Sequence, residues 1–98
     1  MDSRENKAEL FKAAMNKDLE GVKKALKNGA NVNSMDSSGY TALMGASGAG
    51  YCEVTKLLAD KGADLHARDN RGRTALRNAV YWGHNRIADV LREAGATE

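Results

Sequence analysis

The chain has 98 residues, no proline and a formal net charge of +2. This length suits a single domain with a modest core, and so small a charge does not indicate nucleic acid or a membrane as a partner. The lone Cys52 cannot close an intrachain disulfide, no apolar run approaches membrane-spanning length, and no signal-peptide hydrophobic stretch follows residues 1–7. We therefore expect a cytoplasmic protein.

An internal repeat of 33 residues organises the chain. The run Asp-x-x-Gly-x-Thr-Ala-Leu begins at Asp36 and again at Asp69, and a weaker copy precedes both. A period of this length predicts one supersecondary unit stacked three times. We expect a single domain over residues 1–98, with repeats at about 4–35, 36–68 and 69–98.

The first copy has the character of a terminal repeat. It lacks a preceding turn, and lysines are interspersed with apolar residues in its expected second helix, namely Lys23, Lys24 and Lys27. Polar residues on an outermost face keep a finite stack soluble. The last copy carries Arg92 where the others have Leu26 and Ala59. The sequence therefore favours a complete array of one internal repeat between two caps.

The second copy contains the glycine-rich run 45–50, which superficially resembles a phosphate-binding loop. Such a loop needs a preceding strand and a Gly-Lys-Ser/Thr helix start, and neither is present. We interpret this run as the end of a first helix, with small residues that let neighbouring helices approach closely. Leu58 is expected to be buried in the second helix, and Met35 and Met44 to fill gaps in the core.

The third copy shows the order of elements within one unit. Residues 69–72 form a turn in which Gly72 takes a positive φ, and Thr74 suits a helix N-cap. Gly83 ends the first helix, and a second begins near Asn85. The residues expected to be buried are Leu76, Ala79, Val80, Ile87, Val90 and Leu91. Gly29, Gly62 and Gly95 are expected to cap the second helices in the left-handed conformation.

These motifs resemble the ankyrin repeat family over nearly the whole chain. The resemblance rests on the runs 36–43 and 69–76, the run 54–69, and the Gly-Ala pair after each second helix. It departs at the family's Thr-Pro-Leu-His box, which reads Thr-Ala-Leu-Met from Thr41 and Thr-Ala-Leu-Arg from Thr74. The resemblance implies an all-α solenoid of stacked helix-turn-helix units joined by β-hairpin-like turns. It also implies a non-catalytic protein-binding module, and we expect this module to be a monomer.

The resemblance places variable contact positions on a concave face made by the turns and first helices. The positions implied are Met15, Asn16, Ser37, Ser38, Tyr40, Gly48, Ala49, Asn70, Arg71, Arg73, Tyr81 and Trp82, with Arg77 beside them. Arginine and aromatic residues dominate binding hot spots. We therefore select Tyr40, Arg71, Arg73, Arg77, Tyr81 and Trp82 as the partner-binding residues.

Other interpretations of this cluster stay open at the level of sequence. The arginines can be solvated charges partly neutralised by Asp64 and Asp69, with Trp82 packed on a neighbouring turn. An alternative is that they hold RNA or another polyanion, because arginine beside aromatic rings stacks bases and holds phosphates. A third alternative is a scaffold or engineered stack without a natural ligand.

No residue pattern indicates catalysis, a cofactor or a metal. Cys52, His66 and His84 fall at unrelated positions in their repeats, without metal-ligand spacing. We interpret His84 as a turn residue bonded to local backbone and His66 as exposed. No Ser, His and carboxylate set would converge in the stack. The sequence therefore predicts no enzyme, no metal and no cofactor.

Overall fold

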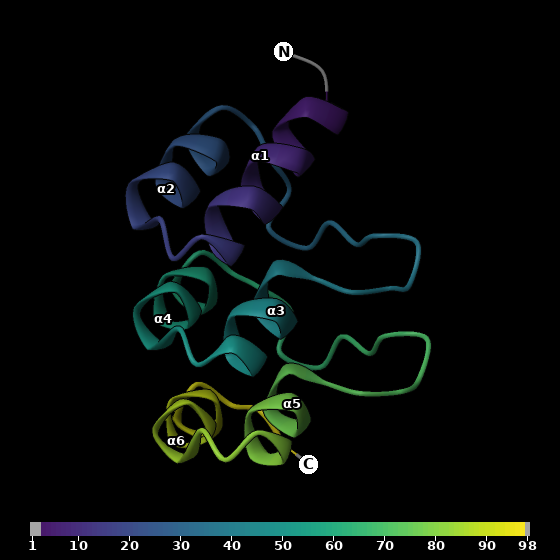
Figure 1. Ribbon diagram of the computed structural model, residues 1–98, viewed down its shortest axis with the longest axis vertical. Coiled ribbons are helices and arrows are strands. Elements are labelled where there is room, and N and C mark those ends of the chain that lie inside the picture. The colour runs from purple at the N-terminus through teal and green to yellow at the C-terminus, as the bar shows by residue number, and fades with distance from the viewer. Residues whose placement is uncertain (1–2, 98) are drawn as a thin grey trace.

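The computed structural model describes residues 3–97, which form three stacked helical hairpins. The helices are α1 (Ser3–Met15), α2 (Leu19–Lys27), α3 (Ala42–Ala49), α4 (Cys52–Asp60), α5 (Ala75–Tyr81) and α6 (Asn85–Glu93). Figure 1 shows α1, α3 and α5 in one row and α2, α4 and α6 in a second, with the connecting turns projecting from the first row. The predicted all-α class is confirmed. In the described range, extended pairing is limited to an isolated bridge between Met35 and Thr41.

The first helices of the second and third repeats are capped by Thr41 and by Thr74, the latter as predicted. Thr41 Oγ1 accepts from the Met44 N–H at 3.3 Å, and Thr74 Oγ1 accepts from the Arg77 N–H at 3.1 Å. Each hydroxyl satisfies a backbone donor that has no partner within the first helical turn. In the first repeat Asp18 caps α2 in the same way, accepting from the Gly21 N–H at 2.9 Å.

The core is built from the same repeat position in successive hairpins. Leu10, Leu43 and Leu76 are 0–1% exposed on the three first helices, and Leu58 and Leu91 are 0% exposed on second helices. Each leucine is covered by the other helix of its hairpin and by adjacent hairpins, so the core is continuous along the stack.

Three predictions of burial were wrong, and two of them concern the last repeat. Val80 is 46% exposed because no further hairpin follows α5, whereas Ser47, at the same position of α3, is 0% exposed. Val90 is only half-buried. Met44 fills the core as predicted, but Met35 lies in a turn and is 55% exposed.

Small residues in α3 bring the first helices together. A Cβ atom on Gly45 would overlap the terminal methyl group of Met15, which packs from α1. A Cβ atom on Gly48 would lie 3.7 Å from Asn78 Cβ and 3.7 Å from Trp82 Cδ1 on the other side. The glycine-rich run 45–50 therefore forms the surface on which both neighbouring repeats pack, and not a phosphate-binding loop.

The prediction that His84 bonds local backbone was wrong. Its Nε2 atom lies 3.2 Å from the carbonyl oxygen of Gly48, a hydrogen-bond contact between repeats. The ring also covers Gly50, which ends α3 with φ 85°. Gly83 holds the same position in the third repeat with φ 76° and nothing nearby, and Lys17 holds it in the first with φ 58°.

Substitution of Gly50 by alanine is expected to cost more than the same change at Gly83. Each alanine adopts a left-handed conformation, which costs about 1–2 kcal/mol. A Cβ atom on Gly50 would additionally lie 2.9 Å from His84 Cε1 and displace the inter-repeat hydrogen bond, for about 1 kcal/mol more. Urea unfolding of the two variants measures the difference, and equal losses would show that the His84 contact contributes nothing.

Candidate functional site

Two aspartates build the turns that precede α3 and α5. Asp36 Oδ1 accepts from the N–H groups of Ser38 (2.8 Å) and Tyr40 (3.0 Å). Asp69 Oδ1 accepts from those of Arg71 (2.9 Å) and Arg73 (3.0 Å) in the same pattern. Side-chain bonds of this kind close a turn locally. The second and fourth residues after each aspartate are therefore held in a defined orientation.

The two turns are also bonded to each other. The Asn70 N–H donates to the Ser38 carbonyl at 2.8 Å, and Asn70 Nδ2 donates to the Ser37 carbonyl at 3.3 Å. Three of the predicted contact positions thus already have partners within the stack. These bonds align the turns, so the side chains that project from them share one face.

Arg73 forms an ion pair with Asp69. Its Nε and Nη2 atoms both lie 3.0 Å from Asp69 Oδ2, and the Asp69 side chain is only 3% exposed against 41% for Arg73. Hydrogen bonds from the backbone N–H of Arg73, then from that of Arg71, hold the pKa of Asp69 below its ordinary value, against a partial opposing effect of burial. The carboxylate is ionised at neutral pH and fixes the guanidinium in place.

Tyr40 lies beside this ion pair. It lines a hollow of about 490 Å³ together with Asp69, Arg71 and Arg73. Burial raises the pKa of the Tyr40 phenol above its ordinary value, the positive charge of Arg73 opposes that effect, and Asp69 and Asp36 add to it. The phenol is therefore neutral at pH 7 and keeps its hydrogen-bond donor.

Tyr81 and Trp82 form an exposed aromatic pair at the end of α5. Their exposed fractions are 77% and 63%, and their rings meet edge to face with centroids 5.0 Å apart. Trp82 leans towards α3: a Cβ atom on Gly48 would lie within 3.8 Å of both Trp82 Cδ1 and the Tyr40 hydroxyl oxygen. The small Gly48 therefore lets aromatic side chains from two repeats approach one another.

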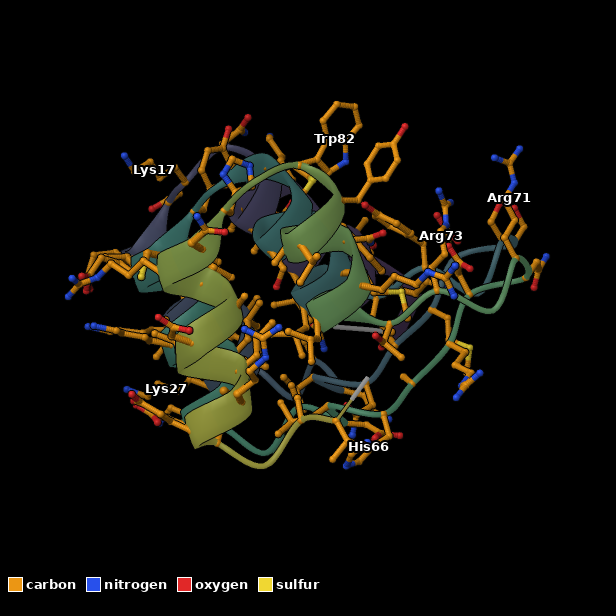
Figure 2. The ribbon with its side chains drawn as sticks, turned by 90° about the horizontal axis from the view of Figure 1, so that it is seen from below. Lys17, Lys27, His66, Arg71, Arg73 and Trp82 are labelled. Carbon is orange, nitrogen blue, oxygen red and sulfur yellow. The ribbon has the colours of Figure 1, made fainter. Side chains whose placement is uncertain are left out.

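A second hollow joins the aromatic pair to the arginines. It measures about 380 Å³ and is lined by Arg71, Arg73, Arg77, Asn78, Tyr81 and Trp82. Figure 2 shows the labelled Arg71, Arg73 and Trp82 along the same side of the molecule. Tyr40 lines the adjoining hollow, which shares Arg71 and Arg73. We call the surface formed by Tyr40, Arg71, Arg73, Arg77, Tyr81 and Trp82 the inner cluster.

The structure adds two residues to those selected from the sequence. Asn78 on α5 lines the hollow, and the buried carboxylate of Asp69 forms the ion pair with Arg73. The position of Asn78 in the repeat, which is that of Gly45, gave no reason to choose it. Asp64, considered as a neutralising charge, instead accepts from the His66 N–H at 2.9 Å within its own turn.

Residues 3–97 contain no second cluster of side chains that points to a metal site or another chemical function. In that range, no group of three His, Cys, Asp or Glu side chains is arranged to hold a metal ion. His66 is exposed on a turn, and Cys52 is a half-buried free thiol. None of the helices described there is both long and apolar enough to cross a membrane.

The comparison with known families agrees with this architecture. A family profile described as ankyrin repeats (3 copies) matches residues 10–97. The chain belongs to the ankyrin repeat family, whose members are generally protein-binding modules and typically non-catalytic. A search of curated proteins found no match.

Proposed function

We propose that residues 1–98 act as one non-catalytic, monomeric domain of the cytoplasm that binds another protein through the inner cluster. The observation that carries the proposal is the hollow of about 380 Å³ where three arginines meet the exposed Tyr81 and Trp82. Large aromatic side chains and arginines supply most of the energy of protein interfaces. A rigid support strengthens such a site, because side chains held in place lose less entropy on binding.

The ion pair suggests what the partner carries. Asp69 engages Arg73, whereas Arg71 and Arg77 project from the same face as exposed side chains. A partner segment with an apolar or aromatic side chain would pack on Trp82, and its carboxylates would meet Arg71 and Arg77. Paired charges of this kind govern specificity and the rate of association more than affinity.

RNA and other polyanions are the alternative partners. The buried carboxylate of Asp69 argues against them, because it neutralises one arginine and places negative charge beside the site. The two partner classes also differ in salt dependence. Phosphate contacts release counterions, so the affinity of a polyanion falls steeply between about 50 and 200 mM salt.

Trp82→Ala and Arg71→Ala are each expected to weaken binding of the protein partner by about 1–3 kcal/mol without loss of helical content. Both side chains are exposed, so their removal leaves the core intact. The partner is isolated by affinity capture on the folded chain, and the dissociation constants are then measured by calorimetry.

Arg86→Ala is the matched control, since Arg86 is exposed on α6 and lies outside the inner cluster. This variant is expected to bind as the unchanged chain does. Full affinity in both Trp82→Ala and Arg71→Ala would contradict the assignment of the inner cluster. A dissociation constant that rises in proportion to a high power of salt concentration would instead identify a polyanion.

A further inference from the structure

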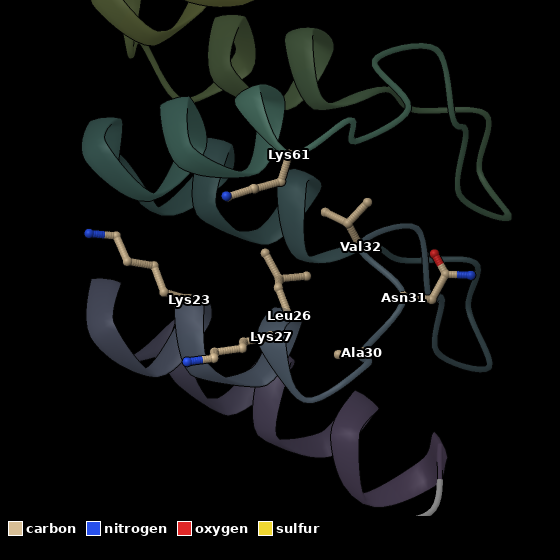
Figure 3. A pocket seen from close by; sticks show the side chains of 7 residues that line it. All are labelled: Lys23, Leu26, Lys27, Ala30, Asn31, Val32 and Lys61. Carbon is tan, nitrogen blue, oxygen red and sulfur yellow. The ribbon is translucent and has the colours of Figure 1, made fainter.

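A third hollow lies between the first two repeats, in the row of second helices. It measures about 700 Å³ and is lined by Lys23, Leu26, Lys27, Ala30, Asn31, Val32 and Lys61. Figure 3 shows Leu26 pointing from α2 towards Lys61, which follows α4, with Lys23 and Lys27 beside Leu26 on the same helix. In Figure 2 the labelled Lys27 lies across the molecule from Arg71 and Trp82. This hollow, which we call the lysine hollow, is therefore separate from the inner cluster.

The lysine hollow has an apolar floor and a cationic rim. Leu26, Ala30 and Val32 are half-buried, whereas the three lysines are exposed. None of its lining residues is acidic. Glu20 lies 3.4 Å from Lys23, but both side chains are more than half exposed, so this pair holds the lysine only weakly.

The charge of the lysine hollow is not a general property of the repeat. A shift of 33 positions gives the counterpart between the second and third repeats, namely Lys56, Ala59, Asp60, Ala63, Asp64, Leu65 and Ala94. Two acidic residues replace Lys27 and Asn31 there, and alanine replaces both Leu26 and Lys61. Several lysines without an acidic neighbour in the lining thus occur at the first interface only, where Leu26 and Val32 are the large apolar side chains in place of Leu65 at the second.

We propose that the lysine hollow binds an acidic peptide segment of a partner protein, with one aliphatic side chain of that segment on the floor. Three ammonium groups without lining carboxylates favour a ligand that carries several negative charges. Leu26 and Val32 favour a ligand with an apolar anchor. Nucleic acid fits less well, because no aromatic side chain lines the hollow for stacking. A membrane fits less well because the apolar residues are half-buried whereas the lysines are exposed.

The test uses the full chain and a fluorescein-labelled peptide in which one leucine is flanked on each side by three glutamates. Fluorescence anisotropy is expected to show saturable binding with a dissociation constant below about 1 mM at 150 mM salt. Lys61→Glu is expected to weaken it about tenfold or more, because it reverses a charge on the rim. Replacing the leucine of the peptide by serine, or its glutamates by glutamines, is expected to weaken binding comparably.

Arg86→Glu is the matched control, since it makes the same change of charge at an exposed residue outside both the lysine hollow and the inner cluster. Full binding by Arg86→Glu and loss by Lys61→Glu support the lysine hollow. Equal losses in these two variants, no saturable binding, or loss in Arg71→Glu without loss in Lys61→Glu, which would place the peptide at the inner cluster, would each overturn the proposal. The proposal would also be overturned if the chain bound vesicles of anionic lipid but not the peptide, and if Lys61→Glu abolished this binding to vesicles. Circular dichroism of the three variants verifies that they are folded.

Discussion

Deletion of residues 69–98 is expected to unfold the two repeats that remain. The deletion removes α5 and α6, which pack on α3 and α4, and it exposes Met44 and Ser47, which are 1% and 0% exposed in the intact chain. Each repeat buries its apolar residues mainly against its neighbours, so stability belongs to the interfaces. Helices of eight and nine residues are too short to persist alone.

Far-UV circular dichroism with urea titration measures the result of the deletion. The intact chain is expected to lose its helical signal in one cooperative step, and the truncated chain to show a weak signal without a transition. Light scattering on the same samples verifies that exposed faces have not produced dimers that mimic stability. A monomeric truncated chain that melts cooperatively near the parent temperature would mean that the repeats are independent units.

Leu58→Ala is expected to destabilise the chain by about 2–4 kcal/mol. Leu58 is 0% exposed on α4, the second helix of the middle repeat, where both neighbouring repeats enclose it. Alanine removes the transfer free energy of the side chain and leaves a cavity that the stack cannot fully close. Small domains have about 5–15 kcal/mol of stability in total, so this loss is a large share.

Leu57→Ala is the control for Leu58→Ala. Leu57 is the preceding residue of the same helix and only half-buried, so its truncation is expected to cost less than half as much. Urea unfolding of both variants gives the two free energies. Equal losses would contradict the assignment of Leu58 to the core, because helix propensity changes alike in the two variants and alanine is the better helix former.

Local sequence signals were sufficient to predict the helices of the repeat and the residues that cap them. Thr41 and Thr74 cap helices because a hydroxyl reaches a backbone N–H three residues away, whatever surrounds it. Gly29, Gly62 and Gly95 follow the second helices with positive φ, as predicted, because glycine lacks the Cβ atom that disfavours this conformation. The 33-residue period then implied stacking, since such short helices need neighbours.

The arrangement of the inner cluster followed partly from the repeat. The positions of Arg71, Arg73 and Trp82 in the unit predicted a shared face, and the structure places them around one hollow. Binding by these residues stays a prediction. The role of Asp69 as a buried support of Arg73 required coordinates, because an exposed and a buried carboxylate look alike in sequence.

Contacts between repeats were decided by packing alone. His84 follows a turn glycine, which suggested a local bond, yet its ring lies against the preceding repeat and contacts the Gly48 carbonyl oxygen. Val80 has the spacing of a core residue but lies on the last face of the stack, where nothing covers it. The lysine hollow likewise exists because Lys61 follows a helix that stacks on α2. Periodicity assigns a residue to a face of its helix, whereas burial depends on whether another repeat packs against that face.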